Sequence, residues 1–288
     1  MTTDVVLPGR TMSPRSHDKL RLIIPSLCSA VLVAVLVTMV TGTLLAPQNP
    51  YAQDPLLSVT LPSQAHLLGT DQLGRDVLSQ LIAGTRPAIL GPLVVAVGCV
   101  LIGCSAGMIA AYRGGVIDAV VTRCADLILS LPALLIAVVV VGVVGGGYWF
   151  TVAVLLLLSL PYEIRLARSA ALVVVSLPYI EAARTLGHGS TRILLKHVLP
   201  NIMPTVVATF LLDFVVALIG FVSLSYLHLG VPPSQPSWGG MLADGQQLIS
   251  QNPWLSIAPA VLLILTAASA TLLGDAVYER ISRRGTQQ

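Results

Sequence analysis

The sequence predicts an all-α membrane protein with six transmembrane helices and with both termini in the cytosol. Its composition, its long uncharged stretches and the distribution of its basic residues predict this class. Of the 288 residues, 55% are hydrophobic and only 10% are charged, against about 25% charged residues in an ordinary soluble chain. A net charge of +3 and 5% aromatic residues also favour contact with membrane lipid over nucleic acid.

The first uncharged stretch predicts the first transmembrane helix at residues 22–46, after a cytosolic tail at 1–21. An apolar run of about 20 residues is long enough to span the hydrocarbon core as a helix. An extracytoplasmic segment follows at 47–87. Within it, residues 69–86 place Val77 and Leu81 on one face, which predicts an amphipathic helix. We favour a position at the membrane interface, and support for a docked binding protein is the alternative.

Five further helices form the core, at 88–280, which is followed by a C-terminal tail at 281–288. The uncharged stretch 127–162 is too long for one helix, and three glycines at 145–147 predict a turn inside it. The core helices are therefore predicted at 88–112, 119–144, 148–170, 202–227 and 255–276.

The basic residues predict the orientation. With the N-terminus inside, fourteen of the sixteen Lys and Arg residues fall in cytosolic segments, and only Arg75 and Arg86 fall outside. Cytosolic loops are the ones that carry such an excess. This orientation places Glu163, Arg165 and Arg168 at the cytosolic end of the fourth helix.

The sequence offers no sign of catalysis or of a metal site. Its four Cys and five His residues lack the spacings of zinc sites. Neither of the two lysines, Lys19 and Lys196, follows the glycine-rich loop of a Walker A motif. We therefore expect no catalytic residue and no metal ligand, and any use of ATP must come from another chain.

Gly103-Cys104-Ser105-Ala106-Gly107 matches the G-x-S-x-G pattern of serine hydrolases. The pattern lies within a predicted hydrophobic helix, where Gly103 and Gly107 also form a GxxxG pair that lets helices approach closely. We favour the packing interpretation. An intramembrane protease with Ser105 as its nucleophile is the alternative.

The long cytosolic loop, residues 163–200, predicts a helix-turn-helix elbow. One short helix starts at Pro178 and stops at Gly187, which suits a left-handed C-cap. A second runs over 191–198 and leads into the fifth transmembrane helix. Such a slim, partly apolar elbow suits a groove on a cytosolic partner, and an ordinary membrane-surface loop is the alternative.

The spacing within this elbow resembles the EAA loop of ABC importer permeases. Glu-Ala-Ala at 181–183 is followed by three residues and Gly187, and Leu-Pro follows at 199–200. In that family the loop docks into the ATPase subunit. The resemblance implies an ATPase-coupling site made by Glu181, Ala182, Ala183, Arg184, Leu186, Gly187, Leu199 and Pro200.

Further segments resemble the C-type permease subunit of dipeptide, oligopeptide and nickel importers. They lie at 68–79, 111–118, 224–233, 236–239 and 272–276. The resemblance implies a type I ABC importer permease (MetI-like) fold. Three positions depart from the family pattern: His197 replaces an aliphatic residue, Phe221 a glutamate and His228 a glycine.

The resemblance also implies partners and a cargo. The chain would be one subunit of an importer in the bacterial cytoplasmic (inner) membrane, paired with a homologous B-type permease. Two ABC ATPase subunits would use ATP and Mg²⁺, an extracytoplasmic peptide-binding protein would deliver the cargo, and this chain would bind no cofactor. The expected cargo is a dipeptide or oligopeptide. Nickel or another small solute is the alternative, and a proton-coupled secondary transporter is a remote one.

Asp213 is an acidic residue within the predicted fifth helix. A charged group at this depth is unfavourable and usually faces protein or a water-filled path. Asp213 is therefore expected to line the translocation path, to form a hydrogen bond with a neighbouring helix, or to couple transport to protons.

Overall fold

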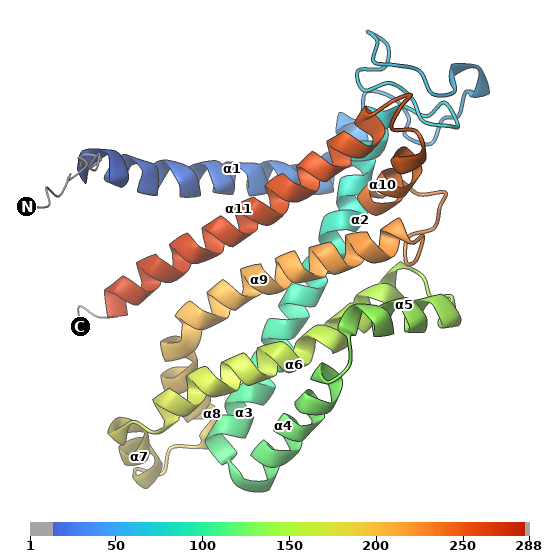
Figure 1. The fold of residues 1–288 in the computed structure, drawn as a ribbon. Helices are drawn as coiled ribbons and strands as arrows, with labels where there is room; N and C mark the ends of the chain where they lie inside the picture. The colour runs from blue at the N-terminus through green and yellow to red at the C-terminus, as the bar shows by residue number, and fades with distance from the viewer. Residues whose placement is uncertain (1–13, 286–288) are drawn as a thin grey trace, which may run out of the picture.

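The computed structural model describes residues 14–285, so parts of the predicted tails 1–21 and 281–288 lie outside the described residues. The described chain is almost entirely helical and contains no β-strand (Figure 1). Its α-helices are α1 (Pro14–Leu45), α2 (Val77–Gly98), α3 (Ser105–Arg113), α4 (Gly115–Leu129), α5 (Ala133–Val144), α6 (Tyr148–Val175), α7 (Pro178–Thr185), α8 (Ser190–Ile193), α9 (Leu199–Tyr226), α10 (Trp238–Gln247) and α11 (Trp254–Gly285). A 3₁₀-helix, η1 (Pro55–Leu57), and two π-helical segments, η2 (Cys99–Cys104) and η3 (Leu194–Val198), complete the set.

Within residues 14–285, five helical stretches are long and apolar enough to cross a membrane, and the pair α4 and α5 adds a sixth when it is counted as one span. These findings confirm the all-α class and agree with a count of six. The five stretches are Ile23–Gly42, Val77–Arg113, Tyr148–Val175, Ser190–Tyr226 and Trp254–Arg280.

The prediction of one straight helix at 119–144 was wrong. α4 and α5 meet at an angle of 77°, and the break lies at residues 130–132. Pro132 has no amide hydrogen, and its ring disfavours helical backbone at the preceding Leu131. The predicted glycine turn is present, since Gly145 closes α5 with φ +65° in the left-handed region.

The prediction of an amphipathic helix at 69–86, separate from the membrane-spanning helices, was also wrong. Residues 69–76 form a loop in which Gly69 and Gly74 have φ of +77° and +72°. Helix α2 begins only at Val77, where the Asp76 carboxylate accepts a hydrogen bond from the amide of Ser79 as an N-cap. From there the helix continues through η2 into α3, so this segment belongs to a membrane span.

Helix α9 lies at the centre of the molecule. Phe214 and Leu218 pack into a cluster with α2, α10 and α11, whereas Val206 packs with α3, α6 and the elbow, and Phe221 packs with α5 and α6. A movement of α9 therefore changes the packing of every hydrophobic cluster in the described chain.

Close packing also joins α3 to α6. A Cβ on Gly107 would lie 2.5 Å from the carbonyl oxygen of Ile164. The glycine pair at 103 and 107 thus forms the tight helix contact that the sequence favoured.

Candidate translocation and coupling sites

The predicted elbow is present at the end of the bundle where α3 turns into α4 (Figure 1). Helix α7 ends before Gly187, whose φ of +79° provides the expected left-handed turn. The second arm, α8 and η3, then continues without a break into α9 as one helical stretch over Ser190–Tyr226. The elbow is therefore rigidly connected to the central helix. The predicted loop boundary at residue 163 was too early, because α6 continues to Val175.

The inner face of the elbow is anchored to the bundle. Ile180, Ala183 and Ile193 are buried in a cluster with α3 and α6. The Arg184 guanidinium lies 4.3 Å from the centre of the Tyr112 ring, a cation–π contact, and also donates a 3.3 Å hydrogen bond to the Tyr112 carbonyl. The inner face of α7 is thus held against α3.

None of the described residues covers the outer face of the elbow. Glu181, Ala182, Thr185 and Leu186 are exposed on one side of α7, with Leu186 exposed by 77%. Of the eight residues predicted to contact the ATPase, Ala183 is buried and Leu199 is partly buried. The other six are exposed: Glu181, Ala182, Arg184, Leu186, Gly187 and Pro200.

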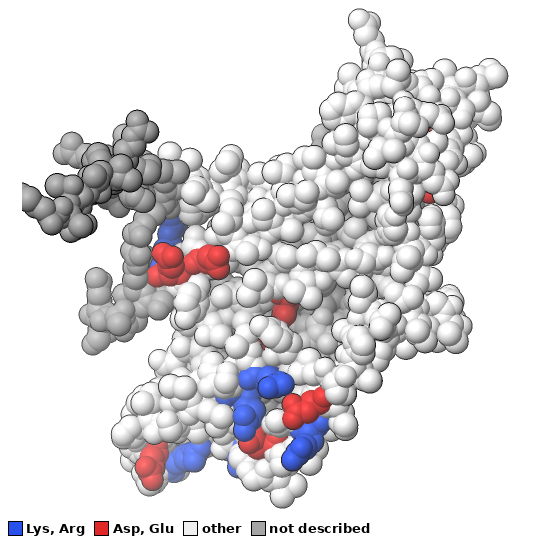
Figure 2. All heavy atoms as spheres, viewed as in Figure 1, with Lys and Arg blue, Asp and Glu red and all other residues white. Residues whose placement is uncertain are grey.

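Charged side chains gather at this same end, over α4, α6 and α7, whereas the middle of the face is almost uncharged (Figure 2). Arg168 of α6 forms a bidentate ion pair with Asp118 of α4. Arg165 lies 3.5 Å from Asp126 in a second, more exposed pair. The charges at this end therefore link α4 to α6 beside the elbow.

His197, where the family usually has an aliphatic residue, is held by aromatic neighbours. Its ring stacks on His188, with 6.3 Å between centroids and 12° between planes, and lies 6.4 Å from the ring of Tyr179. The Asn201 amide donates hydrogen bonds to the Tyr179 hydroxyl and the His197 carbonyl. These contacts link η3 and the start of α9 to α7.

Asp213 is only 5% exposed, and it lines a cavity of about 530 Å³ between α5, α6 and α9. Its Oδ2 atom has no hydrogen-bond partner in the described chain. The cavity is otherwise mainly apolar, with walls that include Ala137, Leu155 and Val216. Asp213 therefore lies in the wall of a cavity, and its part in translocation stays a prediction.

Glu163 is a second buried acid, which the sequence prediction had placed at a cytosolic helix end. It is 1% exposed, and only Oε1 has a partner, the Thr209 hydroxyl at 3.4 Å. Gly103 makes room for it, since a Cβ there would lie 2.9 Å from Cγ of Glu163. The sequence signal for this burial was the uncharged stretch before Glu163. Because α6 continues to Val175, Glu163 lies in the interior of the helix and not at its end.

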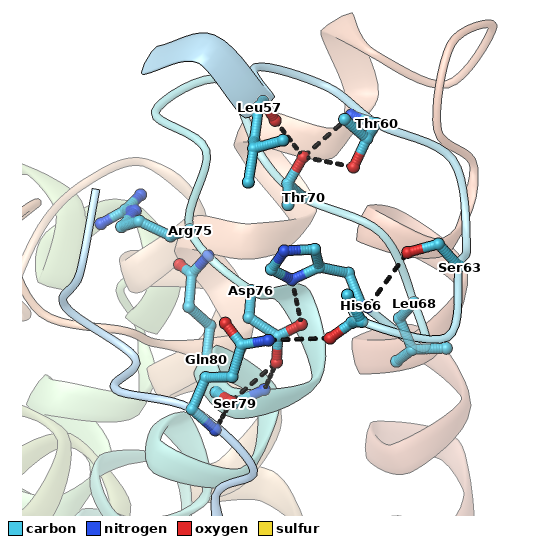
Figure 3. A network of polar contacts seen from close by, with 12 residues as sticks. Leu57, Thr60, Ser63, His66, Leu68, Thr70, Arg75, Asp76, Ser79 and Gln80 are labelled. Atoms are coloured by element: carbon cyan, nitrogen blue, oxygen red, sulfur yellow. Dashed lines mark hydrogen bonds and ion pairs between the residues drawn. The ribbon is translucent and has the colours of Figure 1, made fainter. Parts of the chain in front are cut away.

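A polar network holds the loop at 46–76, at the opposite end of the bundle from the elbow (Figure 3). Asp76 accepts hydrogen bonds from the amide and hydroxyl of Ser79 at 2.8 and 2.7 Å, and its other oxygen lies 3.0 Å from His66 Nδ1. The Thr70 hydroxyl contacts both the backbone and the hydroxyl of Thr60. The segment at 68–79 that resembles the family signature is therefore a loop with its own polar core up to Asp76, followed by the first turn of α2.

Asp71 extends this network toward the helices. Its carboxylate accepts from Nε of Arg75 at 2.6 Å and from the Gln80 amide at 2.9 Å. The Asn252 amide donates to the Leu68 carbonyl at 3.0 Å, and the Trp238 indole donates to the Leu81 carbonyl at 3.1 Å. The Asn252 contact fixes the loop at 46–76 to the segment between α10 and α11, and the Trp238 contact fixes α10 to α2. This end of the bundle is therefore a preformed surface.

Comparison with known proteins places these sites in context. Residues 102–286 match the family model described as "Binding-protein-dependent transport system inner membrane component". The chain is 34% identical to the glutathione transport system permease protein GsiD of Pectobacterium atrosepticum, over 76% of this chain and 73% of that protein. It is 35% identical to the di/tripeptide transport system permease protein DppC of Pseudomonas aeruginosa, over 82% and 80%. It is 30% identical to the probable D,D-dipeptide transport system permease protein DdpC of Escherichia coli, over 87% and 84%.

A solved structure shares the fold. The inward-facing MetNI methionine ABC transporter contains a chain that superposes with a TM-score of 0.56 at 19% identity, over 70% of this chain and 96% of that one. This structural similarity supports the type I importer permease fold.

Proposed function

The chain belongs to the family of binding-protein-dependent transport system inner membrane components, and from this membership we propose how it works as the permease of a peptide importer. It is a multi-pass protein of the bacterial inner membrane. The observation that carries the mechanism is the elbow, whose inner face is buried against α3 and α6 while its outer face is uncovered.

The outer face of α7 is the docking surface for an ABC ATPase subunit. Leu186 enters a groove on that partner, and Glu181 lies at its rim as a charged contact. Because the elbow continues into α9, closure of the ATPase pair on ATP and Mg²⁺ moves the central helix. The bundle then shifts between two packings that open the path to one side or the other.

The complete importer contains chains beyond this one. A homologous B-type permease forms the other half of the path, two ATPases bind the elbows, and an extracytoplasmic binding protein delivers the cargo to the preformed surface around the 46–76 loop. ATP and Mg²⁺ belong to the ATPase subunits, and this chain binds no cofactor of its own. The elbow then lies in the cytosol, as the basic residues predict.

The cargo we propose is a short peptide of two or three residues. The three relatives described above are named for glutathione, for di- and tripeptides and for D,D-dipeptides. None of those three is named for nickel, so the nickel alternative is not favoured.

Uptake of labelled di-, tri- and tetrapeptides by cells with and without this chain tests the cargo. We expect loss of di- or tripeptide uptake in the deletion strain and in a Glu181→Lys strain. Asp275→Lys, at an exposed position of α11, is the charge-matched control and should retain uptake. Unchanged peptide uptake in the deletion strain would contradict the peptide assignment.

A further inference from the structure

The membrane-spanning bundle contains two carboxyl groups without a positive partner. Glu163 and Asp213 are 1% and 5% exposed, and neither takes part in an ion pair among the described side chains. Each keeps one oxygen without a hydrogen bond. An unpaired carboxylate in such surroundings is strongly unfavourable. A positive group from outside the chain would stabilise this arrangement.

The two carboxyl groups are neighbours across the contact between α6 and α9. Thr209 lies one helical turn before Asp213 and donates its hydroxyl to Glu163. This contact places Glu163 beside the turn of α9 that leads to Asp213. Like charges at short range repel each other, so a single cation bound beside them relieves an unfavourable interaction.

The backbone next to the pair is irregular. The π-helical segment η2 packs against both α6 and α9. Gly103, in the same segment, leaves the space that Glu163 occupies. Single π-helical turns within long helices are frequent at functional sites. Three spans thus converge on this pair.

The cavity that Asp213 faces indicates which cation fits. Its volume of about 530 Å³ is in the range of small-molecule sites, about 300–1,000 Å³. Besides Asp213, the polar side chains on its wall are Ser159, Ser223 and Tyr162. A bound Mg²⁺ or Ca²⁺ takes about six or more oxygen ligands, and the described residues contain no cluster of three or more acidic, His or Cys side chains. One acid on an apolar wall instead suits an organic cation.

We propose that Asp213 binds the α-ammonium group of the peptide during translocation, and that Glu163 is a positioning residue that keeps a second acidic group behind it. The proposal rests on the proposed function, because a free peptide N-terminus is the organic cation that such a cargo brings. The apolar walls formed by Leu155, Leu158 and Val216 accept side chains of varied shape. The site therefore selects the ammonium group and tolerates different side chains.

Two cargoes that differ only in this group test the proposal: alanyl-phenylalanine and propionyl-phenylalanine. The complete importer in proteoliposomes is supplied with its binding protein, and each cargo is used at the same occupancy of that binding protein. We expect the wild type to transport the ammonium-bearing cargo faster by about tenfold or more, the effect of one charge-assisted hydrogen bond.

The variants then separate a cargo contact from a structural role. Asp213→Asn should bring the ratio of the two rates close to one, Asp213→Glu should keep it well above one, and Glu163→Gln should give an intermediate ratio. Asp126→Asn is the matched control, since Asp126 is a half-exposed carboxylate on α4, and it should leave the ratio unchanged. The melting temperature of each complex verifies assembly.

Two results overturn the site. The first is an Asp213→Asn importer whose ratio of the two transport rates equals that of the wild type. The second is an equal loss of transport of both cargoes in Asp213→Asn and in Asp213→Glu, which would indicate a structural or proton-linked role for Asp213. Both results presuppose ATP-driven peptide uptake by the wild type. Absence of that uptake would instead overturn the proposed function.

Discussion

Gly107 of α3 lies against the backbone of Arg168 in α6, so closely that a Cβ on Gly107 would lie 2.8 Å from the Arg168 amide nitrogen. The same added atom would meet the Ile164 carbonyl oxygen at 2.5 Å. Because these neighbours are backbone atoms, they cannot move aside without separating the helices. This contact holds α3 and α6 at the distance that buries Glu163 and supports the elbow.

Gly107→Ala should therefore destabilise the protein by about 1–3 kcal/mol, the usual effect of overpacking. Gly142→Ala is the control, since the nearest atom to its added Cβ is a side-chain atom of Leu229 at 4.0 Å. It should be neutral or slightly stabilising, as alanine is the better helix former. Thermal unfolding in detergent measures both, and equal melting temperatures for the two variants would refute the close contact.

The adjacent alanines of the elbow should respond differently to the same change. Ala183 is buried and Ala182 is exposed. Ala183→Leu should lower stability by about 1–3 kcal/mol through overpacking, whereas Ala182→Leu should alter it by less than about 0.5 kcal/mol. Ala182→Leu should nevertheless reduce peptide-stimulated ATP hydrolysis, because it enlarges the proposed docking face. Normal coupling in Ala182→Leu would argue against that face.

His228 occupies a backbone conformation that favours glycine, with φ of +59°. This explains why a glycine is usual at the corresponding place in the family. His228→Gly should stabilise the protein by up to about 1 kcal/mol by relieving the left-handed strain. Its contact with Asp244, at 3.5 Å with both side chains 48% exposed, contributes little.

His228→Ala provides the control, because it removes the same contact and keeps the strain. Chemical denaturation of the two variants compares them directly. The interpretation fails if alanine stabilises as much as glycine does.

Asp76 joins the loop at 46–76 to the start of α2. Asp76→Ala removes the N-cap of that helix and the partner of His66, and it should lower stability by about 1–3 kcal/mol. Asp54→Ala removes the cap of the short helix η1 only, and it should have a smaller effect. Limited proteolysis of the loop, followed over time, should show faster cleavage for Asp76→Ala, and similar rates for both would count against the role assigned to Asp76.

The elbow could be predicted from the sequence because its signals are local. Pro178 starts one arm, Gly187 ends it, and the chain has to turn between two apolar stretches. The membrane-spanning helices could also be predicted, because each needs an uncharged run whose length matches the thickness of a bilayer. The bend between α4 and α5 was also signalled, by Pro132, but a continuous apolar run concealed it.

The buried acids and the external network depend on contacts between distant segments. Glu163 looked like a helix end, because its burial requires Gly103, sixty residues earlier, to leave a space. Asn252 contacts the carbonyl of Leu68 across most of the chain. Such pairs follow from the packing of distant helices and loops, which periodicity and charge patterns do not encode.

The most direct test of the account is uptake of labelled dipeptide into proteoliposomes that contain this chain with its partner permease and ATPases. The account predicts uptake that requires ATP and the binding protein, and that is lost when Leu186→Asp alters the outer face of the elbow. Val116→Asp, at a similarly exposed position at the start of α4 and at the same end of the bundle as the elbow (79% for Val116 against 77% for Leu186), serves as the control for an added charge. Dipeptide uptake by this chain alone, driven by a proton gradient without ATP, would contradict the account and identify a secondary transporter.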